Sequence, residues 1–166
     1  MMDETFCRLA RVIGADALER LKNAHVVLFG VGGVGGFAAE ALARSGVGEI
    51  TLIDGDDVAR SNINRQVIAL NSTIGRSKVE VARERLLDIN PNMRVNALQQ
   101  VFLPGGEVPF GKDVSYVIDA IDTVAAKVEL VRVCREMDVP LISCMGTGNK
   151  LDPTLLRVSD IFSTEV

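Results

Sequence analysis

HVVLFGVGGVGG, residues 25–36, passes without a break from an apolar run into a glycine-rich loop. The run His25–Phe29 has the length and composition of a buried strand. The glycines after it tolerate positive φ and let the backbone approach a ligand closely, and the N-terminus of the helix expected next points free N–H groups at the same place. The junction therefore predicts a phosphate-binding loop, and taken alone it is typical of an NAD-binding protein.

The composition is that of a folded globular protein. The chain has 166 residues, of which 48% are hydrophobic and 24% charged, so we expect one domain spanning residues 1–166. The net charge of −4 provides no overall basic surface for nucleic acid or an acidic membrane. A nucleic-acid partner would therefore need a local patch or residues outside this chain. The apolar stretches are short and interrupted by charges, so no membrane span is expected.

Cysteine usage points to a reducing compartment. Cys7, Cys134 and Cys144 form an odd, scattered set without a C-x-x-C pair, and the N-terminus shows no secretory signal. We therefore expect a cytoplasmic protein in which the cysteines serve as small buried hydrophobic residues.

Apolar runs alternate with stretches of helical period, which favours β-α-β units. The expected fold class is α/β. Residues 25–166 form a Rossmann-like, mostly parallel sheet with helices on both faces, and residues 1–24 form an N-terminal helical segment. Five strands are expected: His25–Phe29, Glu49–Asp54, Arg94–Leu98, Val114–Asp119 and Pro140–Cys144. The alternating stretch Leu155–Ile161 predicts an additional strand.

Three helices are expected between these strands. One runs from about Gly33 to Ser45, and a second starts at Ser77, where Ser77 and Glu80 have the spacing of a capping box. The second helix presents an apolar stripe and ends before Asn90-Pro91; the stripe consists of Val79, Ala82, Leu86 and Ile89. The third helix spans about Val124 to Met137, with Val128, Val131 and Cys134 as its inner face. Prolines and glycines make residues 102–113 a loop rather than a crossover helix.

Asp54 ends the second expected strand, at the position where dinucleotide-binding folds carry the carboxylate that accepts a hydrogen bond from ribose. A surface acid after a tight turn is the alternative. Further polar residues follow that are unusual for a dehydrogenase, and Arg65 and Lys78 suit a triphosphate better than a diphosphate. For Lys78 alone, a solvated surface charge is an equally good interpretation. The candidate nucleotide ligands in this stretch are Asp54, Asp56, Asn62, Arg65 and Lys78.

Asp122 stands after the fourth strand, at the edge of a parallel sheet where ligands bind. A carboxylate there can hold magnesium against phosphates, although Asp122 could also cap the next helix, and Asp119 competes for the metal role. The chain contains no P-loop motif. Its one histidine, His25, is interpreted as structural.

Long stretches of this sequence resemble the ubiquitin-activating-type (ThiF/MoeB/HesA) adenylyltransferases. They are FGVGGVGG at 29–36, AEALARSGVGEITLIDGDDV at 39–58, SNINRQ at 61–66, IGRSKVEVARERLLDINP at 74–91 and VIDAIDT at 117–123. Within that superfamily, residues 6–26, 115–131 and 151–161 are most similar to the tRNA threonylcarbamoyladenosine dehydratases. Sulfur-carrier activators usually carry paired C-x-x-C zinc ligands further along the chain.

The resemblance assigns roles to individual residues. It implies that Gly30, Gly32, Gly33 and Gly35 line ATP, that Asp54 holds the ribose, that Asn62, Arg65 and Lys78 contact the phosphates, and that Asp122 is associated with Mg²⁺. Arg8, in an F-x-R pattern, matches an arginine that reaches from one subunit of a homodimer into the site of the other, with Arg11 as the alternative. Arg65, Lys78, Asp122 and Arg8 are the implied catalytic residues.

The implied reaction is carboxylate activation by adenylation. In the dehydratases, the threonyl carboxylate of threonylcarbamoyladenosine at position 37 of tRNA attacks ATP, and a cyclic product forms after AMP leaves. The alternatives are activation of a sulfur-carrier or ubiquitin-like protein, nucleotide binding without turnover, and an NAD-dependent oxidoreductase. Family members continue well past residue 166, so we expect the C-terminal region of the family to be absent from this chain.

Overall fold

Five short apolar runs form one parallel sheet in the computed structural model, which describes residues 4–148 and 151–163. The strand order is β3-β2-β1-β4-β5, and every neighbouring pair is parallel. The strands are β1 (His25–Phe29), β2 (Glu49–Ile53), β3 (Arg94–Leu98), β4 (Tyr116–Asp119) and β5 (Leu141–Ser143). The expected α/β Rossmann-like class and all five strands are therefore confirmed, each strand within two residues of its predicted ends.

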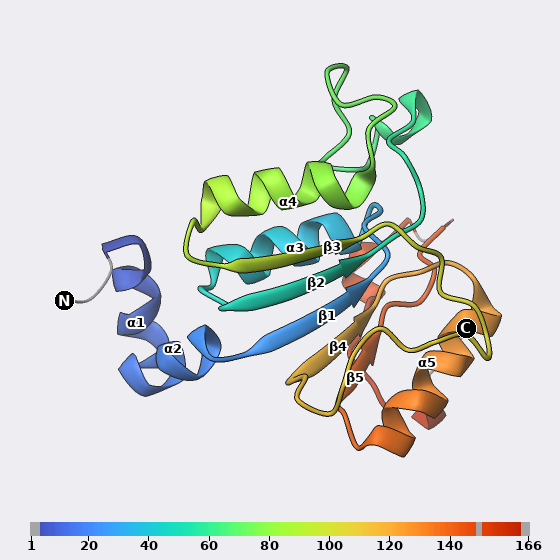
Figure 1. Cartoon of the computed structure of the whole chain (residues 1–166). Coiled ribbons are helices and arrows are strands. Elements are labelled where there is room, and N and C mark those ends of the chain that lie inside the picture. The colour runs from blue at the N-terminus through green and yellow to red at the C-terminus, as the bar shows by residue number, and fades with distance from the viewer. Residues whose placement is uncertain (1–3, 149–150, 164–166) are drawn as a thin grey trace.

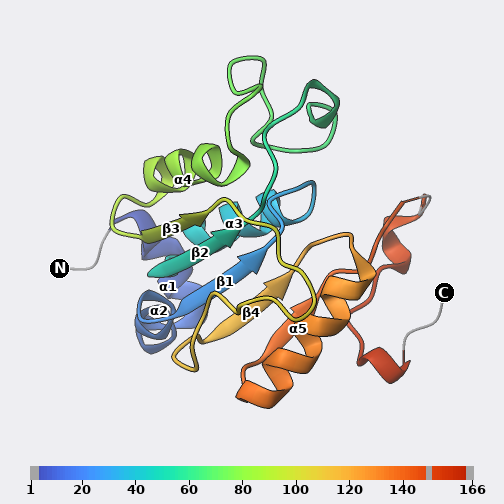
Figure 2. The ribbon, with the colours of Figure 1, turned by 45° about the vertical axis from the view of Figure 1, so that its right-hand side comes forward.

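Helices cover both faces of the sheet. α3 (Gly35–Arg44) and α4 (Lys78–Ile89) lie on one face, and α5 (Val124–Met137) lies on the other (Figures 1 and 2). Strand side chains alternate between the two faces, so Leu28 joins the core beneath α3 and α4, whereas Val27 and Phe29 join the core beneath α5. The sheet is therefore buried on both sides, as parallel sheets generally are.

A loop completes the second face in place of a helix. Between β3 and β4, Phe102 and Phe110 pack edge-on against the ring of Phe29, with ring centroids 5.1 and 6.0 Å from it. The predicted loop over residues 102–113 is confirmed. Its aromatic residues supply the burial that a crossover helix would otherwise give.

The N-terminal segment forms α1 (Cys7–Ile13) and α2 (Ala15–Lys22) after a 3-10 turn at Glu4–Phe6. Phe6 and Leu18 pack around Gly46, where an added Cβ would lie 3.3 Å from both side chains. Gly46 precedes β2, so these helices sit at the amino ends of the strands, away from the glycine-rich loop (Figure 1). The expected N-terminal helical segment is confirmed.

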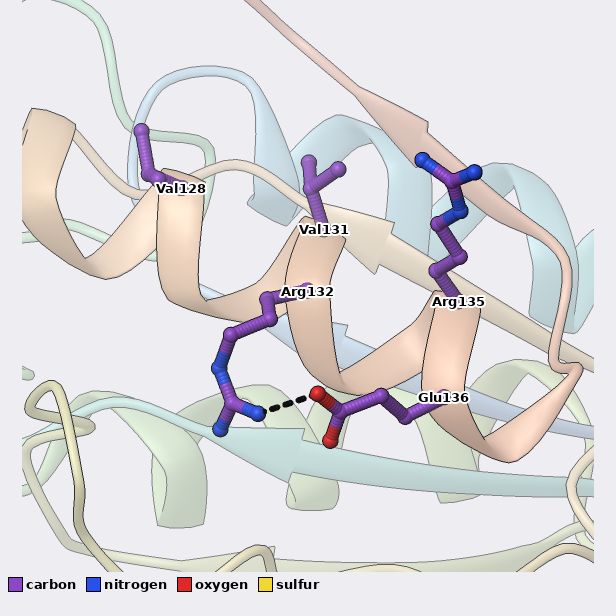
Figure 3. Close-up of a pocket in the computed structure, with 5 residues that line it drawn as sticks. All are labelled: Val128, Val131, Arg132, Arg135 and Glu136. Carbon is purple, nitrogen blue, oxygen red and sulfur yellow. Dashed lines mark hydrogen bonds and ion pairs between the residues drawn. The ribbon is translucent and has the colours of Figure 1, made fainter.

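The face that α5 turns to the sheet differs from the prediction. Val128 and Val131 are 63% and 38% exposed, and Figure 3 shows both projecting from the same side of the helix. Cys134 is buried as predicted, but the rest of the inner face is formed by Ala126, Leu130 and Val133, together with Lys127. Both faces have helical period, and the structure uses the one that also brings Lys127 to a buried carboxylate.

The predicted capping box is wrong, although the helix starts where it was expected. Ser77 Oγ is buried without a hydrogen-bond partner and makes no cap bond to α4. The reason is that residues 56–58 run antiparallel beside residues 75–78: Lys78 N donates to Asp56 O at 3.1 Å and Val58 N donates to Arg76 O at 2.8 Å. The backbone is thus satisfied by another segment. The apolar stripe beneath α4 is as predicted, with Ile89 partly buried.

The strand predicted at Leu155–Ile161 is also wrong. The described part of this region contains only 3-10 turns at Pro153–Leu155 and Ile161–Ser163, and residues 151–163 are exposed throughout. An alternating sequence becomes a strand only where a neighbour supplies pairing and a face to pack on. Neither is found beside this segment within residues 4–148 and 151–163.

Two glycines of the loop should respond oppositely to alanine. A Cβ on Gly35 would lie 1.8 Å from the Gly30 carbonyl oxygen, whereas the nearest neighbour of a Cβ on Gly32 is Gln66 Nε2 at 3.7 Å. We expect Gly35→Ala to lower the free energy of unfolding by about 3 kcal/mol and Gly32→Ala to change it by less than about 1 kcal/mol. Urea denaturation measures both, and equal effects would contradict this packing.

Candidate functional site

The carboxyl ends of β1, β2 and β4 meet at one point of the sheet edge. β1 lies between β2 and β4: the chain runs from β1 to β2 and β3 on one side, and then crosses to β4 and β5 on the other side. The backbones there are in direct contact: Gly30 N donates to Ile53 O, and Ala120 N donates to Phe29 O, both at 2.8 Å. Open α/β sheets bind ligands at such a switch point. The candidate residues that follow these strands are thus brought together.

The four loop glycines divide into two pairs. Gly30 has φ +86°, and a Cβ there would lie 2.7 Å from the Ala120 carbonyl oxygen, while Gly35 packs against Gly30. These two glycines are required by the fold. Gly32 and Gly33 have only ordinary contacts around an added Cβ. They present bare backbone at the edge of the site, which is where a phosphate could approach.

Asp54 fastens the start of the glycine-rich loop. Its Oδ2 accepts a hydrogen bond from Val31 N at 2.7 Å, and its Oδ1 accepts one from Asp56 N at 2.9 Å. An ionised carboxylate has about four lone-pair positions, so it can accept a further bond from a ligand. The sequence predicted Asp54 as a ligand-binding residue, and its backbone contacts give it a second role in shaping the loop.

Lys78 stands in the first turn of α4 with its side chain 7% exposed. Its Nζ donates to Asp56 Oδ2 at 2.7 Å and lies 3.9 Å from Asp54 Oδ1. The partner Asp56 is largely exposed. Lys78 is therefore not a solvated surface charge. It is a buried ammonium held by two carboxylates and placed at a helix N-terminus, where anions are also favoured.

Arg65 lies beside the loop, and no carboxylate among the described residues balances its charge. Its Nη1 donates to Ser61 O and to Asn64 Oδ1, both at 3.0 Å, and neither acceptor is charged. A Cβ on Gly33 would lie 3.6 Å from Arg65 Cγ, so the side chain runs directly along the bare backbone. Asn62, in the 3-10 turn Arg60–Asn62, accepts from Ala59 N through Oδ1 and thereby holds this segment in place.

Gln66 lies at the candidate site, although it is not among the ligands assigned from the sequence. It is buried beside Gly32, and its Oε1 has no hydrogen-bond partner among the described residues. Buried polar atoms are rarely left without partners, except where a ligand or water completes the site. The only signal in the sequence is its place at the end of SNINRQ, one position after Arg65.

The structure distinguishes the two candidate aspartates at the carboxyl end of β4. Asp119 is fully buried and accepts from Lys127 Nζ and Ser143 Oγ, so its oxygens are already engaged. Asp122 is exposed, and its one described side-chain contact is a long hydrogen bond from Thr123 Oγ1 at 3.4 Å. Thr123, not Asp122, is the N-cap of α5. Asp122 is therefore the carboxylate that is free to bind a ligand.

Protein side chains alone do not form a metal centre here. Within the described residues, no group of three His, Cys, Asp or Glu side chains could hold a metal ion. Mg²⁺ commonly takes one or two carboxylates and completes its shell with phosphate oxygens and water. A single free Asp122 is compatible with that kind of site and with no all-protein cage.

Arg8 is not brought to the other candidate residues. It is exposed on α1, as is Arg11, and α1 lies at the amino ends of the strands. The glycine-rich loop, Arg65 and Lys78 lie at the carboxyl ends. Within one chain, neither arginine is part of the site.

The remaining reactive groups are structural. His25 Nε2 lies 2.8 Å from Thr51 Oγ1 within the sheet, as the structural interpretation expected. All three cysteines are free. Burial raises the pKa of Cys134 to about 11 and also raises the pKa of Cys144, so both stay protonated and weakly nucleophilic near neutral pH. Every helix within residues 4–148 and 151–163 is too short or too polar to span a bilayer.

The sequence is similar to a known protein family and to several characterised enzymes. The model of the ThiF family matches residues 6–158. The chain is 50% identical to the tRNA threonylcarbamoyladenosine dehydratase of Bacillus subtilis, covering 96% of this chain and 63% of the relative. It is 34% identical to the sulfur carrier protein ThiS adenylyltransferase of Escherichia coli, covering 91% and 63%. The chain spans about three fifths of the length of the curated dehydratases that it matches most strongly.

Solved structures give the same picture. The E. coli tRNA N6-threonylcarbamoyladenosine dehydratase in complex with ATP superposes with a TM-score of 0.90 at 43% identity, covering 97% of this chain and 67% of that one. The complex of the E. coli enzyme with AMP gives a TM-score of 0.86 at 40% identity, with coverages of 96% and 67%. The similarity therefore extends over nearly the whole chain.

Proposed function

The chain belongs to the ThiF family, and on that premise we propose that it binds ATP and activates a carboxylate by adenylation. The substrate proposed is threonylcarbamoyladenosine at position 37 of tRNA, which the reaction converts to its cyclic form. The observation that carries the proposal is the Arg65 cation, unpaired with any described carboxylate and lying along the bare backbone of Gly33. The greater identity to dehydratases than to the sulfur-carrier adenylyltransferase favours the tRNA substrate.

The residues at the sheet edge fit ATP. Gly32 and Gly33 leave their backbone open to phosphate oxygens, and Gln66 Oε1 is an acceptor that a hydroxyl or amino group of the nucleotide could satisfy. Asp54 retains acceptor capacity for a ribose hydroxyl while holding Val31 N. Lys78, Arg65 and Asn62 would contact the phosphates. A bound phosphate would share Lys78 with Asp56, because the ammonium has three N–H donors.

Asp122 fits Mg²⁺ as a single carboxylate ligand. It is exposed at the end of the β4–α5 turn, whereas Asp119 is occupied by Lys127 and Ser143. When bound, the ion supplies positive charge that stabilises pyrophosphate as it leaves.

In the proposed reaction, a carboxylate oxygen of the substrate forms a bond to the α phosphorus of ATP, and the bond from that phosphorus to the bridging oxygen breaks to release pyrophosphate. A nucleophile within the same substrate side chain then displaces AMP and closes the ring. Two anions must approach each other, so the work of the protein is electrostatic. Arg65 and Lys78 offset the charge on the phosphates, and losing one such donor typically costs about a hundredfold or more in turnover.

We further propose that the active form is a homodimer in the cytoplasm. Arg8 lies at the opposite end of the sheet from its own site, so it can act only on the site of another subunit. The three free thiols agree with a reducing compartment.

The substrate is tested by pyrophosphate release. The chain with ATP and Mg²⁺ is given tRNA carrying threonylcarbamoyladenosine, the same tRNA without the modification, or candidate sulfur-carrier proteins that end in Gly-Gly. We expect release only with the modified tRNA. Release only with a carrier protein would instead support the second candidate function, that of a sulfur-carrier adenylyltransferase. This candidate is considered because the chain is 34% identical to an enzyme of that kind. ATP binding without release under any condition would indicate a nucleotide-binding chain that lacks turnover.

The roles of Arg65 and Arg8 predict complementation between subunits. Arg65→Ala and Arg8→Ala should each lower pyrophosphate release about a hundredfold or more. In co-expressed mixtures, one site of each mixed dimer has both arginines, so about a quarter of the wild-type rate should return. When each single variant is purified alone, Arg65→Ala should also bind ATP more weakly than wild type, whereas Arg8→Ala should not.

Arg94→Ala is the matched control, because Arg94 pairs with Glu49 at the amino ends of the strands and cannot reach the site. It should leave both ATP affinity and release unchanged. Mixtures of the Arg65 and Arg8 variants that stay inactive would contradict the shared site. Unchanged ATP affinity and rate in Arg65→Ala would exclude its role as a phosphate ligand.

A further inference from the structure

A buried ion pair lies directly behind the proposed site. Asp119, at the end of β4, is 0% exposed, and Lys127, in the first half of α5, is 8% exposed. Burying two charges costs solvation free energy that their attraction often fails to recover, so such a pair is weak evidence for stability. The roles proposed for the ATP site do not involve Lys127, although its side chain is buried close to that site.

Lys127 ties three elements together at one atom. Its Nζ donates to both carboxylate oxygens of Asp119 at 3.1 Å and to the carbonyl oxygen of Cys144 at 2.8 Å. These bonds use all three donors of the ammonium group. α5 is thereby joined to the end of β4 and to the residue that follows β5. The Asp119 carboxylate is also bonded by Ser143 Oγ, which adds a second link to β5.

The same network holds the turn that carries Asp122. Asp119 Oδ1 accepts from Ile121 N at 3.1 Å, and Cys144 N donates to Asp119 O at 2.8 Å. On its other side, the turn abuts the glycine-rich loop, where Gly30 meets the Ala120 carbonyl. Asp122 follows immediately, and within residues 4–148 and 151–163 its side chain is held only by the long bond from Thr123. The location of Asp122 is therefore set by its neighbours rather than by its own contacts.

We infer that Lys127 is a positioning residue for the proposed ATP site: by anchoring Asp119 between β4, β5 and α5, it fixes the turn so that Asp122 faces the metal-bound phosphates. This inference rests on the proposed function. A displacement of about 1 Å at a reacting group can cost on the order of a hundredfold in rate. An ion pair that fixes this turn can therefore be retained for its effect on the site, even where an apolar contact of equal volume would stabilise the fold as well.

The test separates positioning from stability. Lys127→Met leaves the Asp119 carboxylate buried without a partner and is expected to destabilise the fold. The double variant Lys127→Met/Asp119→Asn removes both charges at nearly constant volume, so its melting temperature should return close to that of the wild type. Arg132→Met is the matched control, because Arg132 lies on the exposed side of the same helix, where it pairs with Glu129 and also with Glu136, as Figure 3 shows for the second pair.

ATP affinity is measured by calorimetry with Mg²⁺ and with EDTA. With Mg²⁺, the double variant should bind ATP about tenfold or more weakly than wild type, and with EDTA it should match wild type. Asp122→Ala should show the same magnesium-specific loss, and adding it to the double variant should cause little further loss, because both changes remove one interaction. Arg132→Met should match wild type in both conditions.

Two results would overturn the inference while leaving the proposed function intact. One is wild-type ATP affinity with Mg²⁺ in a folded double variant. The other is an equal loss with and without Mg²⁺, which would make the pair a structural feature of the whole site. Failure of the wild-type chain itself to bind ATP would contradict the proposed function, and the inference with it.

Discussion

The close contact between the Gly30, Gly35 and Ala120 backbones is the constraint on which the site depends. It closes the turn after β1 and presses the turn against the end of β4, where no side chain would fit. Because the turn is this tight, α3 begins at the sheet edge and the backbone of Gly32 and Gly33 faces outward. The same contact brings the segment that carries Asp122 alongside the loop. Packing of this kind sets the geometry before any charged residue contributes.

Charge is then distributed unequally around the loop. Lys78 is held between Asp54 and Asp56, whereas Arg65 has only neutral acceptors among the described residues. The buried Lys78 cation is thus paired with carboxylates, and the exposed Arg65 cation is not. Such an arrangement is stable without ligand, because the buried charge is paired, and it still offers a strong electrostatic attraction to a phosphate chain. On the β4 side of the glycine-rich loop, Asp119 and Lys127 neutralise each other, whereas the nearby Asp122 has no cation beside it among the described residues.

The sequence predicts this architecture well where the pattern of neighbouring residues determines the local structure. Strong apolar runs placed all five strands, and the glycines and prolines of residues 102–113 correctly indicated a loop. It failed where a distant segment decides: pairing of residues 56–58 with 75–78 replaces the cap at Ser77, and packing against the sheet places Leu130 and Lys127, rather than Val128 and Val131, on the inner face of α5. No local pattern shows that Gly30 and Gly35 serve packing, or that Gln66 is left with an unpartnered oxygen. The roles of the individual site residues remain predictions.

The central claim is that the glycine-rich loop is one wall of an ATP site and not of a dinucleotide site. Asp54 and the glycines suit either nucleotide, so the distinction rests on Arg65, Lys78 and Asp122 beyond them. Titration calorimetry of the chain with ATP and Mg²⁺, and separately with NAD, tests it most directly. The account predicts saturable binding of ATP and no comparable binding of NAD. Tight binding of NAD with no binding of ATP would contradict it.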